Sequence, residues 1–464
     1  MEDIRLKNAI PVQKGKKYEI KITSLGSSAE GVGRYEDFTV FVPYALPGET
    51  IEAVIEEVKK SYARGKISRI IKSSPDRVEP ACPIYYDCGG CQLQHLSYEG
   101  QLKAKKQQVY DAVTRIGKQR GILIHDTLGA ENPWNYRNKM QFPIGRTKGE
   151  ITIGCYAQGT HEIINTDDCR IQKEGNNEIV RAVREVIEKL RIPVYDEDRH
   201  TGVLRHVVGR VGKNGDIMLV LVTAVKELQR ARDLIRLLRD RLPKLVSLQQ
   251  NVQTYRNNVI MGRDTILLCG KPTILAAIGP FRFHISPRSF FQVNTAQAAV
   301  LYNKALEYAG LTGQQVVIDA YCGTGTITLF LAQKAHKVYG IEIVKPAILD
   351  AQKNARDNHI KNAEFIVGDA TIVMPRLYKQ GIRPDVVVVD PPRAGCTPTV
   401  LETFASMKPE RIVYVSCNPA SLARDIEILD GLGYKAQEIQ PVDMFGQTSH
   451  VETVCLLTAK SSTE

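Results

Sequence analysis

The stretch VVIDAYCGTGTITLF, residues 316–330, reads as a β-strand that ends near Asp319, a short glycine loop and a helix that begins near Thr326. Runs of strand and helix character then alternate as far as RIVYVS at 411–416, with the strand-like runs KVYGIEI, EFIVGDA and DVVVVDPP between them. This alternation predicts a doubly wound, mainly parallel α/β sheet of the Rossmann-like class. In such a sheet the ligand lies at the carboxyl ends of the strands. We place this domain at residues 286–464.

The glycine loop indicates the cofactor. Gly323 and Gly325 permit a tight turn and a close ligand approach, but Thr328 stands where a dinucleotide fingerprint has its third glycine. Glu342 ends the next strand, where a carboxylate can accept hydrogen bonds from both ribose hydroxyls. The pattern favours S-adenosylmethionine (SAM) over the alternative, a dinucleotide. Asp369, after the following strand, is expected to meet the adenine amino group.

Asp390 ends the fourth parallel strand, in VVVVDPPRAG. The two prolines remove two backbone donors and turn the chain sharply out of the sheet, so the Asp390 side chain faces the ligand edge. We expect it to contact a planar base or amine beside the methyl donor. The alternative is a turn capped by an aspartate. Arg393 is placed to pair with phosphate.

Cys417 follows the next strand, in RIVYVSCNP. A cysteine that closes a strand is usually a core residue, but Asn418 and Pro419 turn the chain away at once and expose the thiol. The helix that begins near Ala420 directs the positive end of its dipole towards the sulfur, which predicts a lowered thiol pKa and an available thiolate.

A nucleophile of this kind suits methyl transfer to carbon 5 of uracil. That carbon is too weakly nucleophilic to accept a methyl group unaided, whereas thiolate addition at carbon 6 creates an enolate with electron density on carbon 5. The proton on carbon 5 must then leave, which requires a general base. Glu452, in HVETVCLL, is a candidate. The alternatives are a surface strand residue for Glu452 and a simple hydrogen-bonded imidazole for His450.

Length, composition and charge indicate the number of domains, the cell compartment and the kind of partner. The 464 residues exceed one ordinary core, so two or three domains are expected, and 43% hydrophobic with 24% charged residues is typical of a soluble globular protein. We find neither a run of roughly 20 apolar residues nor a signal-peptide core in MEDIRLKNAI, so we expect a cytoplasmic protein without a membrane span. The net charge of +11 favours a nucleic-acid partner, although a mildly basic surface would also explain it.

Two further domains precede the α/β sheet. Short alternating runs separated by turn residues predict an OB-like five-stranded β-barrel at residues 12–73, either an RNA-binding module or a plain appendage. Residues 74–285 read as a central α+β domain. A basic amphipathic helix at 96–117 lies within it and is expected to pack on the C-terminal domain.

Ten cysteines in a chain without an export signal should stay reduced, which favours metal or catalytic roles over disulfides. Three of them cluster in ACPIYYDCGGCQLQH, namely Cys82, Cys88 and Cys91.

The chain resembles the bacterial RNA (uracil-C5)-methyltransferases over nearly its full length. The motifs that carry the resemblance are SFFQVN (289–294), DAYCGTGT (319–326), DPPRAG (390–395), VSCNP (415–419) and HVE (450–452). The resemblance implies that Cys417 is the nucleophile, that Glu452 is the base, and that Cys396 is not the nucleophile. It also implies a cofactor and substrate pocket formed by Gln292, Tyr321, Glu342 and Asp390.

The barrel looks like the TRAM domain of the ribosomal-RNA branch of this family. The resemblance therefore implies a monomer that modifies one or two uridines of 23S rRNA. Cys82-x5-Cys88-x2-Cys91 with Cys169 matches the [4Fe-4S] pattern of that branch. Four thiolates alone can hold zinc or a cubane cluster, so the residues leave the metal open, and Cys155 is a rival for the fourth place.

Carbon 6 of a stacked uracil is shielded, so the target base must be flipped out of a single-stranded or loop region. We expect the barrel, the cysteine-bearing domain and the lysines between Lys103 and Lys106 to grip the RNA. Three rival functions remain. The first is the same chemistry on the T-loop uridine of tRNA, the second is a non-catalytic ribosome-assembly factor, and the third is a redox-sensing Fe-S protein.

Overall fold

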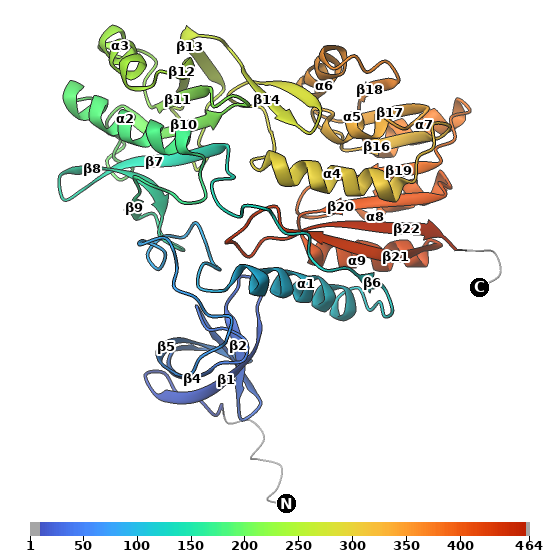
Figure 1. The fold of residues 1–464 in the computed structure, drawn as a ribbon, viewed down its shortest axis with the longest axis horizontal. Coiled ribbons are helices and arrows are strands. Elements are labelled where there is room, and N and C mark those ends of the chain that lie inside the picture. Colours follow the sequence, from blue (N-terminus) through green and yellow to red (C-terminus); the bar gives the residue numbers. More distant parts are fainter. Residues whose placement is uncertain (1–9, 461–464) are drawn as a thin grey trace, which may run out of the picture.

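The computed structural model describes residues 10–460, which form a small barrel, a central sheet and a large α/β sheet (Figure 1). Most of the N-terminal stretch in which we found no secretion signal lies outside the described residues. Within residues 10–460, no helix is long and apolar enough to cross a membrane.

The predicted N-terminal barrel is confirmed. Its five strands close in the order β1-β2-β3-β5-β4. They are Lys17–Leu25 (β1), Gly31–Tyr35 (β2), Phe38–Val42 (β3), Thr50–Val58 (β4) and Tyr62–Lys72 (β5). In β4 the side chains of Ile51, Ala53 and Ile55 point into the core, while the residues between them are only partly buried. This period of two is what the alternating sequence predicts.

The central domain is built on a seven-stranded sheet with the order β13-β12-β11-β10-β7-β8-β9. Its strands are Lys139–Thr147 (β7), Glu150–Tyr156 (β8), Ile163–Asn165 (β9), Leu204–Val211 (β10), Ile217–Thr223 (β11), Leu245–Val252 (β12) and Asp264–Gly270 (β13), and its helices are Glu174–Leu190 (α2) and Ala231–Arg241 (α3). Strands β10 and β11 are buried along their whole length. One face packs against α2 and α3, and Val208, Val220 and Val222 on the other face join the core of the C-terminal domain.

A separate hairpin connects the two larger domains. Its strands are Ile274–Ile278 (β14) and Phe281–Ile285 (β15). It packs against α4 and α6 of the C-terminal domain, and the Lys213 amide of the central domain donates to the Leu275 carbonyl at 2.9 Å.

The C-terminal domain confirms the predicted α/β class. Its sheet has the order β18-β17-β16-β19-β20-β22-β21-β6, with the first five strands parallel and β22 antiparallel to both neighbours. The strands are Leu123–Ile124 (β6), Val316–Ala320 (β16), Lys337–Glu342 (β17), Ala363–Val367 (β18), Val386–Val389 (β19), Arg411–Ser416 (β20), Tyr434–Val442 (β21) and Glu452–Ala459 (β22). The helices are Thr295–Ala309 (α4), Thr326–Ala332 (α5), Lys345–Asp357 (α6), Ala370–Lys379 (α7), Pro398–Ser406 (α8) and Pro419–Gly431 (α9). Two hydrophobic cores flank the sheet.

Helix α1 (Tyr98–Arg115) packs on α9 and β21 of the C-terminal domain, and β6 after it extends the same sheet. The buried face of α1 shows that one of the lysines expected to grip RNA cannot do so. Lys105 is 1% exposed and its Nζ lies 2.5 Å from the Asp443 carboxylate, so this lysine cannot contact RNA. Lys106 forms an ion pair with Asp126. Lys103 is exposed and makes no hydrogen bond to any residue that the structure describes.

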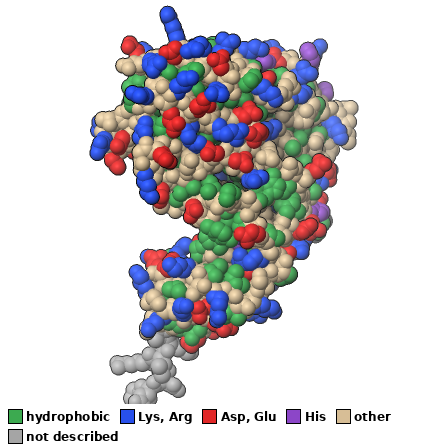
Figure 2. All heavy atoms as spheres, turned by 60° about the vertical axis from the view of Figure 1, so that its left-hand side comes forward, with side chains coloured by type: hydrophobic (Ala, Val, Ile, Leu, Met, Phe, Trp, Pro, Cys, Tyr) green, Lys and Arg blue, Asp and Glu red, His purple; other side chains and the backbone are tan. Residues whose placement is uncertain are grey.

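On one face of the molecule, positive and negative side chains are mixed (Figure 2). On the face shown in Figure 2, Lys and Arg side chains are interspersed with Asp and Glu, and hydrophobic side chains gather where the barrel joins the larger body. Charge on this face therefore forms no single basic stripe.

Candidate active site and cysteine cavity

The register of the large sheet brings Cys417 and Glu452 together. In the antiparallel pairing of β20 with β22, Ser416 lies opposite Thr453, and Thr453 Oγ1 donates to the Ser416 carbonyl at 3.1 Å. The next residue outward on each side is Cys417 after β20 and Glu452 at the start of β22. The predicted nucleophile and base, 35 residues apart in sequence (452 − 417), are therefore neighbours at the carboxyl edge of the sheet.

Asp390 belongs to the same group. Val389 pairs with Tyr414 in β20 and with Ala320 in β16, so Asp390 lies between Tyr321 on one side and the end of β20 on the other. The charge of Asp390 acts on both Cys417 and Glu452. Three acidic groups thus share one small region.

Burial raises the pKa values of both carboxyl groups into the range around neutral pH. Desolvation, with a smaller contribution from the Asp390 charge, raises the pKa of Glu452 to about 8, and Arg393 opposes the shift. Burial raises the pKa of Asp390 to about 7. Acids with pKa values near the operating pH are suited to accept and return protons.

The expected lowering of the Cys417 pKa is wrong. Helix α9 does begin after the cysteine, with Asn418 as its N-cap, but the thiol is half-buried next to two carboxyl groups. Desolvation, Glu452 and Asp390 raise the thiol pKa, and Arg393 is the cation that opposes them. At the higher pH where the thiol ionises, both carboxyl groups are already ionised, so their charges and burial outweigh the partial charge of a helix end.

The loop that follows Asp390 is fixed to the loop that carries Cys417. The Asn418 side-chain amide donates to the Arg393 carbonyl at 3.0 Å, and the Cys396 amide donates to the Asp425 carboxylate at 2.8 Å. Cys396 itself is 3% exposed. These bonds hold Arg393 where its charge reaches both Cys417 and Glu452.

Ionisation of Glu452 opposes folding, which gives a test of its burial. Below about pH 4.5 the folded and unfolded states are both protonated; between pH 4.5 and 8 the unfolded chain loses a proton that the folded chain keeps, so stability falls as pH rises. We expect Glu452→Gln to raise the free energy of unfolding by roughly 3–4 kcal/mol at pH 9 but by under about 1 kcal/mol at pH 5. Urea unfolding of both proteins at the two pH values measures this. An equal difference at both would show that Glu452 is not desolvated.

The glycine loop has the conformation that the sequence predicts. Tyr321, Gly323 and Gly325 have φ values of 63°, 56° and 80°. A side chain at Gly325 would meet the Phe365 ring at 3.0 Å. Glu342 accepts hydrogen bonds from the Gly323 amide at 3.2 Å and the Val344 amide at 2.8 Å, so its carboxylate is fixed beside the loop. Each oxygen retains a further lone pair for a ligand hydroxyl.

Thr328 and Asp369 have structural partners. Thr328 Oγ1 donates to the buried Asp319 carboxylate at 2.5 Å and thereby ties α5 to the end of β16. Asp369 is exposed and caps α7, since its Oδ1 accepts from the Thr371 amide at 2.8 Å. Contact of Asp369 with adenine stays a prediction.

Tyr302 is a site residue that the sequence did not reveal. It is 1% exposed on α4, and its hydroxyl lies 3.4 Å from Thr326 Oγ1 and is hydrogen-bonded to the Gln292 side chain. The charges of Asp390 and Glu452 act on it as well. Tyr302 occupies a core position of an amphipathic helix, so no local pattern distinguishes it from a packing residue.

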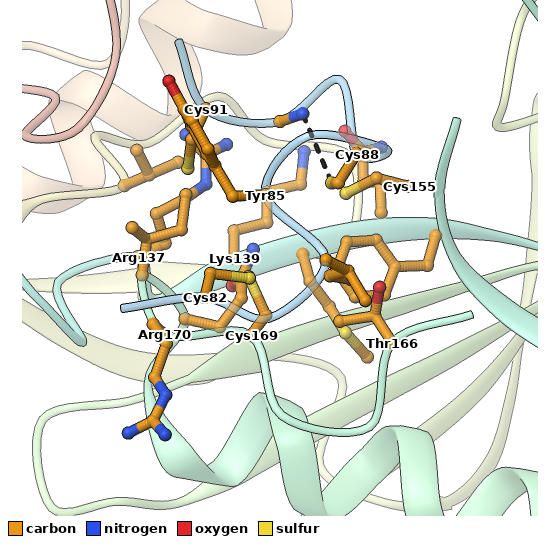
Figure 3. A pocket seen from close by; sticks show the side chains of 18 of the residues that line it. Cys82, Tyr85, Cys88, Cys91, Arg137, Lys139, Cys155, Thr166, Cys169 and Arg170 are labelled. Atoms are coloured by element: carbon orange, nitrogen blue, oxygen red, sulfur yellow. Dashed lines mark hydrogen bonds between the residues drawn. The ribbon is translucent and has the colours of Figure 1, made fainter. Parts of the chain in front are cut away.

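Five cysteines line one cavity of about 400 Å³ in the central domain (Figure 3). They are Cys82, Cys88, Cys91, Cys155 and Cys169. The Cys88 and Cys155 thiols are hydrogen-bonded to each other. Within residues 10–460 no group of three or more His, Cys, Asp or Glu side chains is arranged to hold a metal ion.

The other described walls of this cavity are apolar, neutral polar or cationic. Arg137, Lys139 and Arg170 line it, and none of its described lining residues is acidic. Phe290, Phe291 and Val293 form another wall, so the segment that carries Gln292 separates the cysteine cavity from the cofactor loop. Burial raises the pKa of Cys169 to about 11 and that of Cys91 to about 12.

Comparison with known families and proteins agrees with this geometry. Residues 97–460 match the family model of the tRNA (uracil-5-)-methyltransferases, and residues 11–68 match the TRAM domain. The chain is 51% identical to an uncharacterized RNA methyltransferase of Clostridium tetani, over 98% of each chain. It is 49% identical to one of Halalkalibacterium halodurans, over 98% of this chain and all of that protein.

Among solved structures, the chain is similar to the tRNA (uracil-54, C5)-methyltransferase of Pyrococcus abyssi in complex with S-adenosyl-L-homocysteine. The TM-score is 0.75 at 29% identity, over 95% of this chain and 100% of that one. The chain is therefore a SAM-dependent RNA methyltransferase that belongs to the RNA uracil-5 methyltransferase family and carries an N-terminal TRAM domain.

Proposed function

We propose that this enzyme transfers a methyl group from SAM to carbon 5 of one or two uridines in 23S rRNA, acting as a monomer in the cytoplasm. The observation that carries the chemistry is the pairing of β20 with β22, which places Cys417 next to Glu452 and beside Asp390. A protein that only bound RNA would have no use for a buried acid and a thiol side by side at the carboxyl edge of the sheet.

The residues suggest the following sequence of steps. The Cys417 thiolate, formed by loss of its proton to solvent, adds through Sγ to carbon 6 of the flipped uracil, and the electron pair of the 5,6 double bond moves to give an enolate with density on carbon 5. The electron pair on carbon 5 would then bond to the methyl carbon of SAM, while the methyl–sulfur bond breaks, its electron pair stays on sulfur and S-adenosyl-L-homocysteine is left. Glu452 then removes the proton from carbon 5, the double bond re-forms, and the Cys417 thiolate leaves. Bound SAM supplies the methyl group and a positive sulfonium charge, which favours the ionised forms of the neighbouring thiol and carboxyl groups.

The remaining site residues would hold the cofactor and the base. The Gly323–Gly325 loop would approach the amino-acid part of SAM, Glu342 the ribose and Asp369 the adenine. Tyr321 follows the strand next to that of Asp390, and the Gln292 side chain bonds to Tyr302, on which the Asp390 charge also acts. Asp390 would bind the edge of the uracil. The buried Tyr302 hydroxyl would hold the Gln292 side chain in place through their hydrogen bond.

The choice between ribosomal and transfer RNA rests on the N-terminal half. The TRAM barrel and the cysteine set support 23S rRNA, because the resemblance links both to the ribosomal-RNA branch. The similarity to the Pyrococcus abyssi enzyme, whose name gives uridine 54 of a tRNA as its target, favours T-loop uridine as the alternative.

Methyl-acceptor assays with unmodified 23S rRNA and unmodified tRNA decide between them. Incorporation into the rRNA alone, mapped to one or two uridines, supports the proposal. Incorporation into tRNA alone would establish the alternative, and incorporation into neither would support an assembly factor.

A groove between the barrel and α1 supports RNA binding on this side of the molecule. Its volume is about 560 Å³, and it runs from Ser24 and Gly26 on the barrel past Lys103 and Arg115 to Ser449. Ser449 directly precedes His450 of the HVE motif. An RNA strand in this groove would lead towards the catalytic residues.

We further propose that Cys82, Cys88, Cys91 and Cys169 hold a [4Fe-4S] cluster. The thiols surround a cavity instead of converging on one point, which suits a cubane better than a single zinc ion bound at about 2.3 Å from each sulfur. Arg137, Lys139 and Arg170 would balance the negative charge of four thiolates. The cluster would fix the loop of residues 82–91, which carries three of the four cysteines.

Cysteine replacement tests this assignment. We expect Cys169→Ser to lose most of the iron and acid-labile sulfide, because four thiolates are needed to close the cluster, while Cys155→Ser keeps about four irons per chain. Iron and sulfide analysis of protein purified without oxygen measures both. The reverse result would give the fourth position to Cys155, and zinc in place of iron would overturn the cluster.

A further inference from the structure

The loop between β21 and β22 brings the catalytic base into the site, and it is held mainly by distant parts of the chain. This base-bearing loop comprises residues 443–451, directly before Glu452. Its contacts come from α1, from α4 and from the segment after the cysteine motif. The position of Glu452 therefore depends on more than its own strand.

Gln447 is the most constrained residue of the loop. Its φ is +71°, a backbone conformation that residues other than glycine adopt at a cost of about 1–3 kcal/mol. It is 3% exposed. Its amide donates to Gln101 Oε1 at 3.0 Å, and its carbonyl accepts from the amides of Gln92 and Leu93, both at 3.0 Å.

Gln101 on α1 is hydrogen-bonded to Gln447 twice, and we call this pair of bonds the Gln101–Gln447 joint. Gln101 Nε2 donates to Gln447 Oε1 at 3.0 Å and lies 3.0 and 2.9 Å from the carbonyls of Leu93 and Leu96. Gln101 is 1% exposed. The two glutamines are thus linked in both directions, with both ends of the Gln101 amide engaged and buried. Such a network fixes one backbone conformation because every alternative leaves a buried polar group unpaired.

The start of the loop has a second anchor on the same helix. Lys105 Nζ bonds to Asp443 Oδ1 at 2.5 Å and to the Phe445 carbonyl at 3.1 Å, and the Tyr98 hydroxyl donates to Asp443 Oδ2 at 2.7 Å. From α4, Asn294 Nδ2 donates to the Met444 carbonyl at 3.0 Å. Asp443 and Gln447 are therefore two fixed points ahead of Glu452.

We propose that Gln101 and Gln447 are positioning residues that set the catalytic base Glu452 for the release step. This inference rests on the proposed function, because it assigns a role within that reaction. Glu452 acts after methyl transfer, when it must reach the proton on carbon 5, whereas Cys417 is held by a different loop. Loosening the Gln101–Gln447 joint should therefore slow release of the adduct more than its formation.

The same joint links the base to the cysteine cavity. Gln92 and Leu93, whose amides bind the Gln447 carbonyl, directly follow Cys91. The segment directly after the cysteine-bearing loop (residues 82–91) thus holds the base-bearing loop through two main-chain hydrogen bonds.

The test separates adduct formation from adduct release. We would use rapid-quench kinetics of wild type, Gln101→Leu and Gln447→Gly on the RNA that the wild type methylates. Glycine tolerates φ of +71°, so Gln447→Gly keeps the turn while it removes the side-chain link. Gln437→Leu is the matched control, since Gln437 lies exposed on β21 and its side-chain amide bonds to Thr458 Oγ1.

In both joint variants we expect release to slow by about tenfold or more, with adduct formation within about twofold of wild type. Access of water to Glu452 should also move the pH midpoint of release to lower pH, whereas a smaller folded fraction would lower the amplitude of the reaction and leave this midpoint unchanged. Release rates and pH midpoints equal to wild type in both variants would overturn this inference alone. A wild type that forms neither adduct nor methylated RNA would overturn the proposed function, and this inference with it.

Discussion

Replacing Cys417 by alanine is expected to lower methyl transfer to RNA by about 10⁴-fold or more, because no other group in the site can activate carbon 5 of uracil. Cys417 is half-buried at the carboxyl end of β20, and Arg393 is the cation that favours its ionised form. The other cysteines of this domain, Cys322, Cys396 and Cys455, are buried. Transfer of labelled methyl groups from SAM to RNA measures the effect.

SAM affinity of the variant should stay close to that of wild type, since no cofactor contact is assigned to the thiol. Cys269→Ala is a suitable control, because Cys269 lies on β13 of the central domain, away from the large sheet. Residual transfer by Cys417→Ala within about tenfold of wild type would exclude Cys417 as the nucleophile.

Replacing Glu452 by glutamine is expected to trap the enzyme on its own RNA. Methyl transfer can still occur once in each active site, but the proton on carbon 5 stays, so Cys417 cannot be eliminated. We expect turnover to fall by about 10²- to 10⁴-fold, and a methylated protein–RNA adduct to accumulate on ordinary uridine. A denaturing gel with labelled SAM shows this adduct directly.

Glu402→Gln provides the control, because Glu402 is exposed on α8. Free methylated RNA formed by Glu452→Gln at the wild-type rate would contradict the assignment. The other acid that faces the thiol, Asp390, would then be the next candidate for the base.

The pKa values also predict the direction of the pH dependence. The base works only when ionised, and the pKa of Glu452 is raised to about 8. The Cys417 pKa is raised too, so both groups gain activity as the pH increases. Turnover should therefore rise from pH 6 to pH 9, and a maximum below pH 7 would contradict the protonation states described above.

The sequence alone predicted the features that depend on local pattern. Alternating strands and helices identify the α/β sheet, and the residue that follows each strand lies at the ligand edge whatever the loops do. This is why Glu342, Asp390 and Cys417 could be named together before their positions were known, whereas Tyr321 came from the family resemblance. The five-stranded barrel follows in the same way from a period of two.

The features that the sequence did not predict depend on long-range packing. Lys105 sits in a basic helix and looks like a surface charge, yet its partner Asp443 is 338 residues away. The Cys417 pKa was misjudged because the helix dipole is local, whereas the opposing carboxyl groups come from other strands. Tyr302, Gln101 and Gln447 are polar residues in ordinary surroundings, and only the assembled fold shows what each of them holds.

The most direct test of the central claim uses 23S rRNA fragments that contain 5-fluorouridine, with labelled SAM, wild-type enzyme and Cys417→Ala on a denaturing gel. Fluorine cannot be removed as a proton, so the reaction stops at the covalent intermediate. We expect a labelled protein–RNA adduct with wild type and none with Cys417→Ala. An adduct that persists in Cys417→Ala, or methylated fluorouridine RNA released free by the wild type, would contradict it.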